Sequence, residues 1–466
     1  MTATQRRQIR PSLVIGVLSC AGMTVSLMQT VLLPLIPELP GLLHVTTDDA
    51  SWLITATLLA SAVATPSVSR LADMYGKRKM MLISLLGMLA GSVLGALGKS
   101  LIILIIARAL QGFAMALVPI GMSIMRDELP REKLSYSVAL MSATLGIGAA
   151  VGLPLSGIIF THFGWHAVFW VSAILASIML VGIFLVVPES TIRTGGNFDL
   201  LGAILLSTLL VSFLLGVTKG GQWGWTSQST LISFAIAVIL FALWLPWEFR
   251  VQNPLVDLHT SMGRPVLLTN FASFLIAFSM FCNMLTTTEV LQMPLATGYG
   301  FGLSTIRAGL AMLPAGIAMI VMAPVSAAIT RKFGPRTTLM VGAAILASGY
   351  LERIFFMNSV GEVIFGAIFV SCGTAIAYAP MPILIMRSVP ITETAAANGL
   401  NNVLRSIGTS TASAVVAAIF TGSSMKLMDA FVPEQQAFKY IYISAVVAAI
   451  LGGMVAFTIP KSTNAS

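Results

Sequence analysis

The sequence reads PSVSRLADMYGKR from Pro66 to Arg78 and, 258 residues later, PVSAAITRKFGPR from Pro324 to Arg336. In both stretches a Gly follows the Pro by ten residues, an aromatic residue precedes the Gly, and an Arg lies two residues after it. Each stretch also ends a long apolar run. Chance recurrence of Pro and Gly at helix ends is one explanation, but the matching aromatic and basic positions favour a chain built from two parallel halves.

The composition requires a membrane environment for most of the surface of this chain. Of its 466 residues, 57% are hydrophobic and 9% are charged, and the mean hydropathy is +0.93. Soluble domains contain about 25% charged residues, so we expect an all-α integral membrane protein. The net charge of +9 is explained by the topology described below, and we expect no nucleic-acid partner.

Apolar runs long enough to cross a bilayer of about 30 Å occur fourteen times along the chain. The first repeat stretch ends the second run and the second stretch ends the tenth run, so the seventh and eighth runs form an inserted pair. The expected domains are a six-helix bundle over residues 1–190, two inserted helices with a cytoplasmic linker over 191–264, and a second six-helix bundle over 265–466. The fourteen runs begin near residues 12, 48, 80, 100, 134, 166, 199, 229, 265, 304, 336, 359, 395 and 438.

Lys and Arg are distributed unevenly between the two sides of the membrane. If the N-terminus is cytoplasmic, 18 of the 26 Lys and Arg residues lie on the inner side and six on the outer side, while Arg108 and Arg405 lie within spans. This bias follows the positive-inside rule. We therefore expect a multi-pass protein of the cell (inner) membrane, surrounded by membrane lipids, with both termini in the cytoplasm.

The loop after the second run carries a specific motif. Residues Ser69 to Lys79 read SRLADMYGKRK, which resembles the major facilitator signature G-x-L-A-D-x-x-G-R-K, with Ser69 in place of the first Gly. Gly76 permits a tight turn. Asp73 can pair with a basic group or with the N-terminus of a neighbouring helix, which would hold the cytoplasmic side shut. In the second copy Arg331 replaces the acid, although Arg78 has a counterpart, so the expected latch is asymmetric.

The fourth run contains Arg108-Ala-Leu-Gln111-Gly112, which resembles the R-x-x-Q-G motif of proton-coupled members of the superfamily. An Arg about seven residues into a span should face the bundle interior, where polar groups can hold it. Arg108 is then either a residue that adjusts the protonation of a nearby acid or a structural centre for hydrogen bonds.

The fifth run is rich in small residues. Gly146, Gly148, Gly152, Pro154 and Gly157 form a pattern similar to the antiporter motif that ends in G-P-x-x-G-G, although its spacing differs. Small residues allow helices to pack closely and Pro loosens the backbone. Glycine-rich spans occur in many bundles, so this pattern alone is weak support for antiport.

The resemblance extends over about the whole chain and points to the fourteen-span drug/proton antiporters of the superfamily. It implies a major facilitator fold with 14 transmembrane helices (6+2+6) and a secondary active transporter of the multidrug efflux type, linked to antibiotic resistance. Such a transporter exports lipophilic drugs or natural products in exchange for protons by alternating access. The proton gradient supplies the energy without a cofactor, and we expect a monomer. Further similar segments are Phe163-Gly164-Trp165, Asp199-Leu200-Leu201-Gly202, Trp223-Gly224-Trp225 and Asn253-Pro254-Leu255-Val256-Asp257.

One position departs from the family pattern and leaves the coupling residue open. The family usually has an acid in helix one, and this chain has Met28 there. Glu289, about 24 residues beyond the start of the ninth run, should lie near its outer end, where it either exchanges protons or is an ordinary interfacial residue. The adjacent Glu352 and Arg353 are better explained as an interfacial pair.

Arg405 is the deepest charge in the sequence, roughly ten residues into the thirteenth run, where Asn398, Asn401 and Asn402 give the helix a polar face. It is either a substrate or gating site that accepts an anionic or neutral polar group, or a buried partner for backbone carbonyls. With Asp73, Arg108 and Glu289 it completes the expected proton-coupling and gating residues. The expected cavity-lining residues are Gln29, Asn270, Met280, Asn283, Asn398 and Asn402.

The sequence contains no pattern of an enzyme or of a metal site. It has no phosphate-binding G-x-x-x-x-G-K-[ST] loop, and His162 and His166 lack nearby Cys or carboxylate ligands. Besides a proton-coupled exporter, two alternatives are open. A uniporter or importer of a polar metabolite would transport without a proton gradient, and a channel or non-transporting receptor would show no alternating accessibility.

Overall fold

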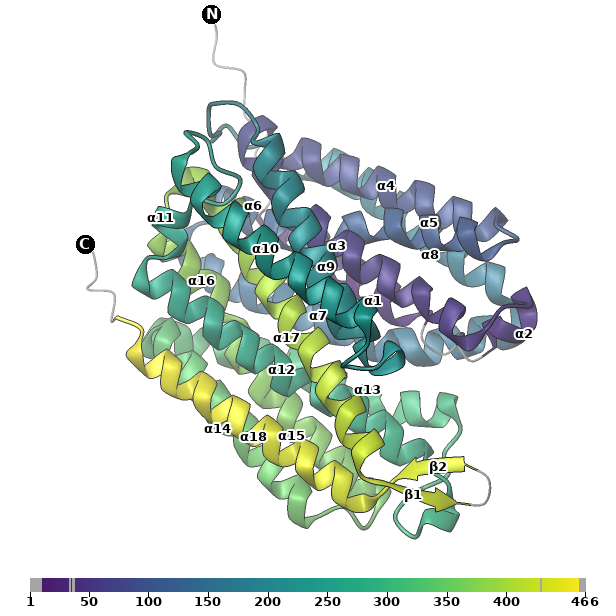
Figure 1. Ribbon diagram of the computed structural model, residues 1–466. Coiled ribbons are helices and arrows are strands. Elements are labelled where there is room, and N and C mark those ends of the chain that lie inside the picture. Colours follow the sequence, from purple (N-terminus) through teal and green to yellow (C-terminus); the bar gives the residue numbers. More distant parts are fainter. Residues whose placement is uncertain (1–10, 33–34, 36–37, 428–429, 461–466) are drawn as a thin grey trace, which may run out of the picture.

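The computed structural model describes residues 11–32, 35, 38–427 and 430–460 and consists almost entirely of helices (Figure 1). The helices α5, η2 and α6 continue one another, with a short 3₁₀ turn in the middle. The elements of the first half are α1 Pro11–Thr30, α2 Leu39–Leu43, α3 Thr47–Tyr75, α4 Lys77–Leu97, α5 Leu101–Gly112, η2 Phe113–Ala116, α6 Leu117–Glu128, α7 Arg131–Phe163 and α8 Trp165–Val186.

Two long helices follow, and then the second half, which ends in a short antiparallel hairpin and a last helix. In the hairpin, Ser424 lies opposite Pro433 and Leu427 opposite Ala430. The elements are α9 Leu200–Trp223, α10 Gln228–Arg250, α11 Leu258–Ser261, α12 Arg264–Gln292, η3 Leu295–Thr297, α13 Thr305–Phe333, α14 Pro335–Phe355, α15 Val360–Tyr378, α16 Pro380–Ser388, η4 Ile391–Glu393, α17 Thr394–Gly422, β1 Ser424–Leu427, β2 Ala430–Pro433 and α18 Gln435–Thr458.

The long helices agree closely with the expected spans. Each of the fourteen expected starts lies within three residues of the start of a helix. In the described residues, 13 helical segments are long and apolar enough to cross a membrane. The helix α7 is outside that set but has 33 residues, which is more than the roughly 20 that a span requires. The chain is therefore a multi-pass membrane protein, with a helix count close to fourteen.

The helices form two groups that meet along two helix pairs (Figure 1). In the first half α1 packs against α7, and α4 packs against α5 and α8; in the second half α12 packs against α17 and α18, and α14 against α15 and α18. The pair α7 and α13 and the pair α3 and α17 join the two halves. The inserted α9 packs on α10 and also reaches both α3 and α17.

The two repeat stretches have the same local structure. A helix ends before Gly76 and before Gly334, and these glycines have φ angles of 123° and 85°, a region that favours glycine. The following Arg78 donates to the Phe184 carbonyl of α8 with its guanidinium carbon 5.0 Å from that ring. Arg336 has the same relation to Phe457 of α18, also at 5.0 Å. The basic residue of each copy thus ties the turn to the last long helix of its own half.

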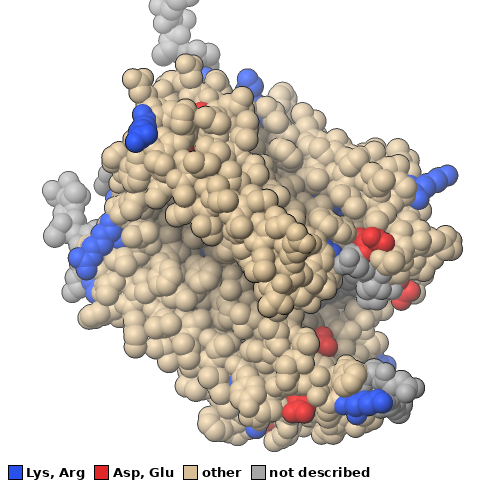
Figure 2. Space-filling model, viewed as in Figure 1, with Lys and Arg blue, Asp and Glu red and all other residues tan. Residues whose placement is uncertain are grey.

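Charged residues are scarce over most of the surface. On the face shown in Figure 2, Lys, Arg, Asp and Glu gather at the two ends of the molecule, and the broad middle carries almost none. Large apolar side chains point outward there, as in α8 and α10. In water this surface would be unfavourable, whereas hydrocarbon tails solvate it well.

Candidate functional site at the junction of the two bundles

The carboxylate of Asp73 connects the two bundles directly. It lies near the end of α3, and its oxygens accept hydrogen bonds from the backbone N–H groups of Ala395 at 3.3 Å and Ala396 at 2.8 Å. Both N–H groups belong to the first turn of α17, where helix N–H groups have no partners within the helix and the helix dipole favours an anion. Asp73 therefore caps a helix of the opposite bundle, as its motif led us to expect.

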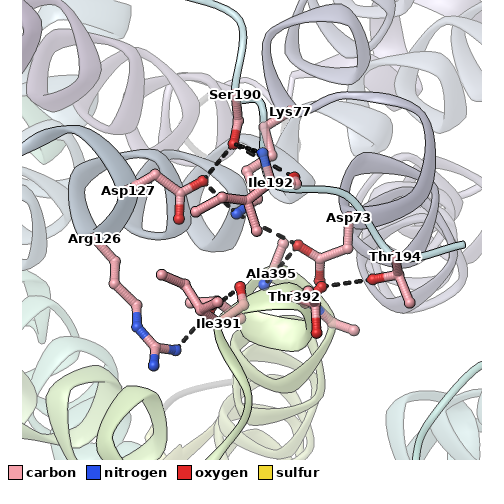
Figure 3. Close-up of polar contacts among 12 residues, drawn as sticks. Asp73, Lys77, Arg126, Asp127, Ser190, Ile192, Thr194, Ile391, Thr392 and Ala395 are labelled. Carbon is pink, nitrogen blue, oxygen red and sulfur yellow. Dashed lines mark hydrogen bonds and ion pairs between the residues drawn. The ribbon is translucent and has the colours of Figure 1, made fainter.

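Three further hydrogen bonds lie beside this cap (Figure 3). Arg126 of α6 donates to the Thr394 hydroxyl at 2.6 Å and to the carbonyl of Val389 at 3.3 Å. Thr194, in the segment after α8, donates to the Thr392 carbonyl at 2.7 Å. We call the contacts of Asp73, Arg126 and Thr194 with residues 389–396 the latch. No local pattern indicates this role of Arg126, because its partners are more than 260 residues away in the sequence.

A buried cation lies between two acids behind the latch. The ammonium group of Lys77 lies 2.6 Å from Asp127 and 3.7 Å from Asp73, and all three side chains are almost completely buried. The hydroxyl of Ser190 donates to the same Asp127 oxygen at 2.6 Å. This arrangement fixes the end of α3 to α6, so that Asp73 is presented to α17 in a defined position.

The first turn of α4 is capped from another part of the same half. Glu189 accepts from the backbone N–H of Arg78 at 3.2 Å and of Lys79 at 3.1 Å. A Cβ atom at Gly76 would lie 2.7 Å from the Glu189 carboxylate, so only glycine fits there, both for space and for its positive φ. The geometry of this turn therefore depends on Gly76 and on Glu189, an acid outside the signature.

The molecule is closed at the latch and hollowed at its opposite end. Near the latch, Ile383, Met386 and Ala395 of the second bundle pack into the apolar core of the first bundle. The other end carries α2 and the β1–β2 hairpin (Figure 1), and the surface there is indented between the two halves (Figure 2). The structure therefore has one closed end and one open end.

Arg108 lies inside the first bundle and is held by the backbone of two other helices. It donates to the carbonyls of Leu53 at 3.3 Å and Met28 at 3.2 Å and to the side chain of Gln111 at 2.8 Å. Gln111 in turn donates to Ser92 at 2.9 Å. Arg108 thus has the polar partners that its depth requires, and none of them is an acid.

A narrow cavity with an empty volume of about 220 Å³, including its open side, adjoins this network. The expected cavity residue Gln29 is in its wall, and so is Met28, the residue at the position where the family usually has an acid. A Cβ at Gly112 would be 2.8 Å from Ala60, so this glycine allows α5 to approach α3. The complete lining is Val25, Met28, Gln29, Thr57, Arg108, Gln111, Ala114 and Met115.

The glycines of α7 face two different neighbours. Gly148 and Gly152 lie against the backbone and Thr30 of α1, within the first bundle. Gly146 and Gly157 lie against Met319 and Ile306 of α13, in the second bundle. Pro154 is inside the helix between these contacts. The small residues of α7 therefore serve both packing within a bundle and the contact between bundles.

Glu289 lies in the last turn of α12, near the open end, as its sequence position predicts. Its side chain is exposed, and it makes no hydrogen bond or ion pair with any residue that the structure describes. It is therefore accessible from the open side and independent of the latch.

Arg405 is buried near the middle of α17, with 9% of its surface exposed. Its guanidinium carbon lies 4.0 Å from the ring centre of Tyr378 in α15, and its Nε atom is buried without a hydrogen-bond partner. Nearby on the same helix, Asn398 donates to the Thr394 carbonyl at 2.9 Å, while its Oδ1 atom has no partner. Asn402 is also buried.

Three expected cavity residues take part in the packing of the second bundle. Asn270 accepts a hydrogen bond from Asn401 at 2.9 Å between α12 and α17. Met280 packs against the apolar core of that bundle. Asn283 is buried and accepts a hydrogen bond from Arg353. These polar groups stabilise helix pairs, because an unpaired amide inside a membrane bundle is costly.

The expectation of an interfacial Glu352–Arg353 pair is wrong. Arg353 turns away from its neighbour into the bundle, where it is 1% exposed and donates to Asn283, to Thr287 at 2.8 Å and to Tyr442 at 2.9 Å. The sequence could not show this, because the three partners come from α12 and α18. They use part of the hydrogen-bonding capacity of the guanidinium, whereas Arg353 Nε and Glu352 Oε2 are buried without partners.

Two acids near the latch end, Glu248 and Asp199, have partners that no local sequence pattern indicates. Glu248 of α10 is 2% exposed and accepts from the backbone N–H of Val256, while its other oxygen has no partner. Asp199, which caps α9 by accepting from Gly202 at 2.9 Å, also accepts from Trp247 at 3.1 Å. These acids hold the ends of α9 and α10 together.

Comparison with known proteins identifies the family. The family model described as Major Facilitator Superfamily matches residues 18–413 of this chain. The chain belongs to the Major Facilitator Superfamily. As a member of this superfamily, the protein is a membrane transporter and not an enzyme. Its two joined helix bundles agree with the fold of such transporters.

Several proteins similar in sequence to this chain are named as exporters of drugs or antibiotics. The tetracenomycin C resistance and export protein of Streptomyces glaucescens is 28% identical over 403 residues, which cover 85% of this chain and 73% of the relative. The multidrug efflux pump LfrA of Mycolicibacterium smegmatis is 25% identical over 474 residues, which cover 100% of this chain and 92% of the relative. The protein therefore fits the efflux type of transporter.

A solved structure has the same fold. The human organic anion transporter MFSD10 (TETRAN) aligns with a TM-score of 0.70, covering 96% of this chain and 100% of that chain, at 15% sequence identity. At this identity the likeness concerns the fold alone.

Proposed function

We propose that the protein exports lipophilic small molecules across the cell membrane by alternating access, in exchange for protons. The observation that carries the proposal is the latch, in which the carboxylate of Asp73 caps α17 of the other bundle. A transporter needs contacts of this kind at one end that can break when the other end closes. Each hydrogen bond contributes on the order of 1 kcal/mol, which is small enough to be exchanged in every cycle.

The latch end is the cytoplasmic end in this proposal. Lys77, Arg78, Lys79 and Arg126 lie there, and cytoplasmic loops of membrane proteins carry an excess of Lys and Arg. The conformation is then closed to the cytoplasm and open to the outside. In export, substrate would bind after the latch opens and leave through the open end after it closes.

Glu289 is the proposed site of proton exchange. It is an exposed carboxyl near the open end, where it can take up a proton from outside in the open conformation. Asp73, Arg108 and Arg405 belong to the proposed gating residues. The proton gradient is the proposed energy source, and the monomer is the proposed unit.

The test uses purified protein in liposomes under an imposed pH gradient. Proton flux is measured with cationic, neutral and anionic lipophilic compounds for the wild type, Glu289→Gln and the control Glu434→Gln, which removes an exposed acid at the same end. We expect compound-dependent proton flux in the wild type and the control, with at least a tenfold loss in Glu289→Gln.

Each other result selects a different mechanism. Proton flux that survives Glu289→Gln excludes this residue as the carrier. Transport that continues without a pH gradient indicates a uniporter or importer. Passive flux, or binding without transport, indicates a channel or a receptor and contradicts export.

A further inference from the structure

The charges deep inside the long helices are all positive in the part of the chain that the structure describes. Every Asp and Glu of these helices lies within four residues of a helix end, as Asp73 and Glu289 do. Only Arg108 and Arg405 lie more than six residues from both ends of their spans. A cation at this depth is costly unless an anion or several polar groups compensate it.

The two buried cations differ in how many of their N–H groups donate hydrogen bonds to the protein. Arg108 donates three hydrogen bonds to groups of the first bundle. Arg405 lies over the ring of Tyr378, and its Nε is buried without a partner. Tyr378 offers its ring face and its hydroxyl to the guanidinium, which offsets only part of its desolvation, and no salt bridge to a carboxylate is found for Arg405 among the described residues.

The neighbours of α17 show where Arg405 points. Gly399 packs against α3 and Gly408 against α12, while Val403 belongs to the apolar cluster with α9. With 100° between successive residues, Arg405 lies between the α3 side and the α12 side and opposite α9. Because α3 belongs to the first bundle and α12 to the second, the guanidinium is directed toward the junction of the two bundles.

A second polar atom without a partner shares this side of the helix. Asn398 precedes Arg405 by seven residues, which is two helical turns or about 10 Å, and its buried Oδ1 has no hydrogen-bond partner. Arg405 offers a charged donor and Asn398 offers an acceptor. Buried groups of this kind normally have partners, so the pair fits a ligand with an anionic group and a separate hydrogen-bond donor.

We propose that Arg405 is the counter-ion of the transported substrate, and that the substrate is an amphiphilic organic anion such as an aromatic carboxylate. The carboxylate accepts from the guanidinium, and the charge of the interior disfavours lipophilic cations because no acid lies at this depth in the described helices. This inference rests on the proposed export function and specifies its substrate class.

The test measures equilibrium binding and does not depend on transport. The probes are 4-(1-pyrenyl)butyrate, the neutral 4-(1-pyrenyl)butanol and the cationic 4-(1-pyrenyl)butyltrimethylammonium, which share one apolar body. Titration calorimetry is carried out on protein in nanodiscs of zwitterionic lipid, with empty nanodiscs subtracted. Arg405→Gln removes the charge, and Arg405→Lys retains it. Arg307→Gln is the control, because it removes an exposed cation near the open end.

We expect the wild type and Arg307→Gln to bind the carboxylate at least about tenfold more tightly than the cation, as a charge-assisted hydrogen bond would give. Arg405→Gln should lose this preference while its affinity for the alcohol stays within about twofold, and Arg405→Lys should retain part of it. The unchanged alcohol affinity also shows that the variant is folded.

Several results would overturn the inference. They are equal or tighter binding of the cation by the wild type, unchanged carboxylate binding in Arg405→Gln, binding of none of the probes, and competition showing that the site takes chloride only. Failure of export in liposomes together with an intact carboxylate preference would contradict the proposed function instead, so the two failures are distinguishable.

Discussion

At the scale of single residues, the contact between the bundles depends on the carboxylate of Asp73, which accepts hydrogen bonds from the first turn of α17. Asp73 lies three residues before Gly76 in the signature, and this local motif made a contact with a helix N-terminus predictable. The partners of Arg126 and Arg353 are distant in sequence, and no local pattern marks them. The sequence therefore predicts the positions of these charged residues along the helices, but their hydrogen-bond partners depend on how the helices pack.

The first prediction concerns the cap on α17. Asp73→Asn removes the charge and one acceptor oxygen, so the latch should open more often by about tenfold, which corresponds to the loss of about one charge-assisted hydrogen bond. The measurement is the maleimide labelling rate of Thr392→Cys in a background whose three native cysteines are replaced by alanine.

The control for this experiment is Asp49→Asn, at the other end of α3. The carboxylate of Asp49 accepts from the backbone N–H and the hydroxyl of Thr46 in the capping box of α3 and has no contact with the latch, so the labelling rate should stay at its original value. An unchanged rate in Asp73→Asn would show that the cap does not hold the bundles together.

The second prediction concerns the buried ion pair. Lys77→Met leaves Asp73 and Asp127 buried without their cation, and removing one partner of such a pair costs about 3–5 kcal/mol. Thermal unfolding in detergent should therefore show a much lower midpoint than for Lys79→Met, whose side chain is exposed on the same turn.

The double variant Lys77→Met/Asp127→Asn separates charge from packing. It removes one of the two uncompensated acids, so it should recover part of the lost stability. If the double variant is as unstable as Lys77→Met, the loss comes from packing, and the ion pair is not its cause.

At the scale of elements, the helix boundaries were the most predictable feature. A transmembrane helix must cross about 30 Å of hydrocarbon, where its backbone has no contact with water. Its length and its apolar character can therefore be recognised in one continuous stretch of sequence. The packing partners of each helix were less accessible to sequence reasoning. The glycines of α7 form one motif in the sequence, but some of them face α1 and others face α13. Only the structure shows which glycine faces which helix.

The third prediction uses this division. A Cβ added at Gly148 would meet the backbone carbonyl of Met23 and lie 2.9 Å from the backbone nitrogen of Leu27 in α1, whereas one at Gly157 would contact side-chain atoms only, with Cγ1 of Ile306 at 2.9 Å. Gly148→Ala should therefore destabilise the protein by about 1–3 kcal/mol. In Gly157→Ala the gain in helix propensity of up to about 1 kcal/mol should offset the contact.

Thermal unfolding of the two variants under identical conditions checks this prediction. Equal midpoints would mean that α1 shifts to make room at Gly148, and that the close contact of α1 and α7 is not a rigid feature of the first bundle.

At the scale of the whole molecule, the duplicated turns and the two bundles are consistent with the proposed rocking motion. Arg78 and Arg336 tie each turn to a helix of its own half, so each bundle is internally fixed. The latch, by contrast, connects the bundles through a few hydrogen bonds. The inserted α9 contacts both α3 and α17, which places it beside the junction, where it must follow any movement of the two halves.

The last prediction tests whether the two ends move in opposite directions. Spin labels on the exposed Lys133 and Arg387 report the latch end, and labels on the exposed Lys99 and Asn358 report the open end. If rigid bundles rock about the junction of α3, α7, α13 and α17, Asp73→Asn should add a population with a longer latch distance and a shorter distance at the open end, measured by double electron–electron resonance. A rise of both distances together would indicate that the bundles separate, because rocking about a fixed junction must shorten one distance when it lengthens the other.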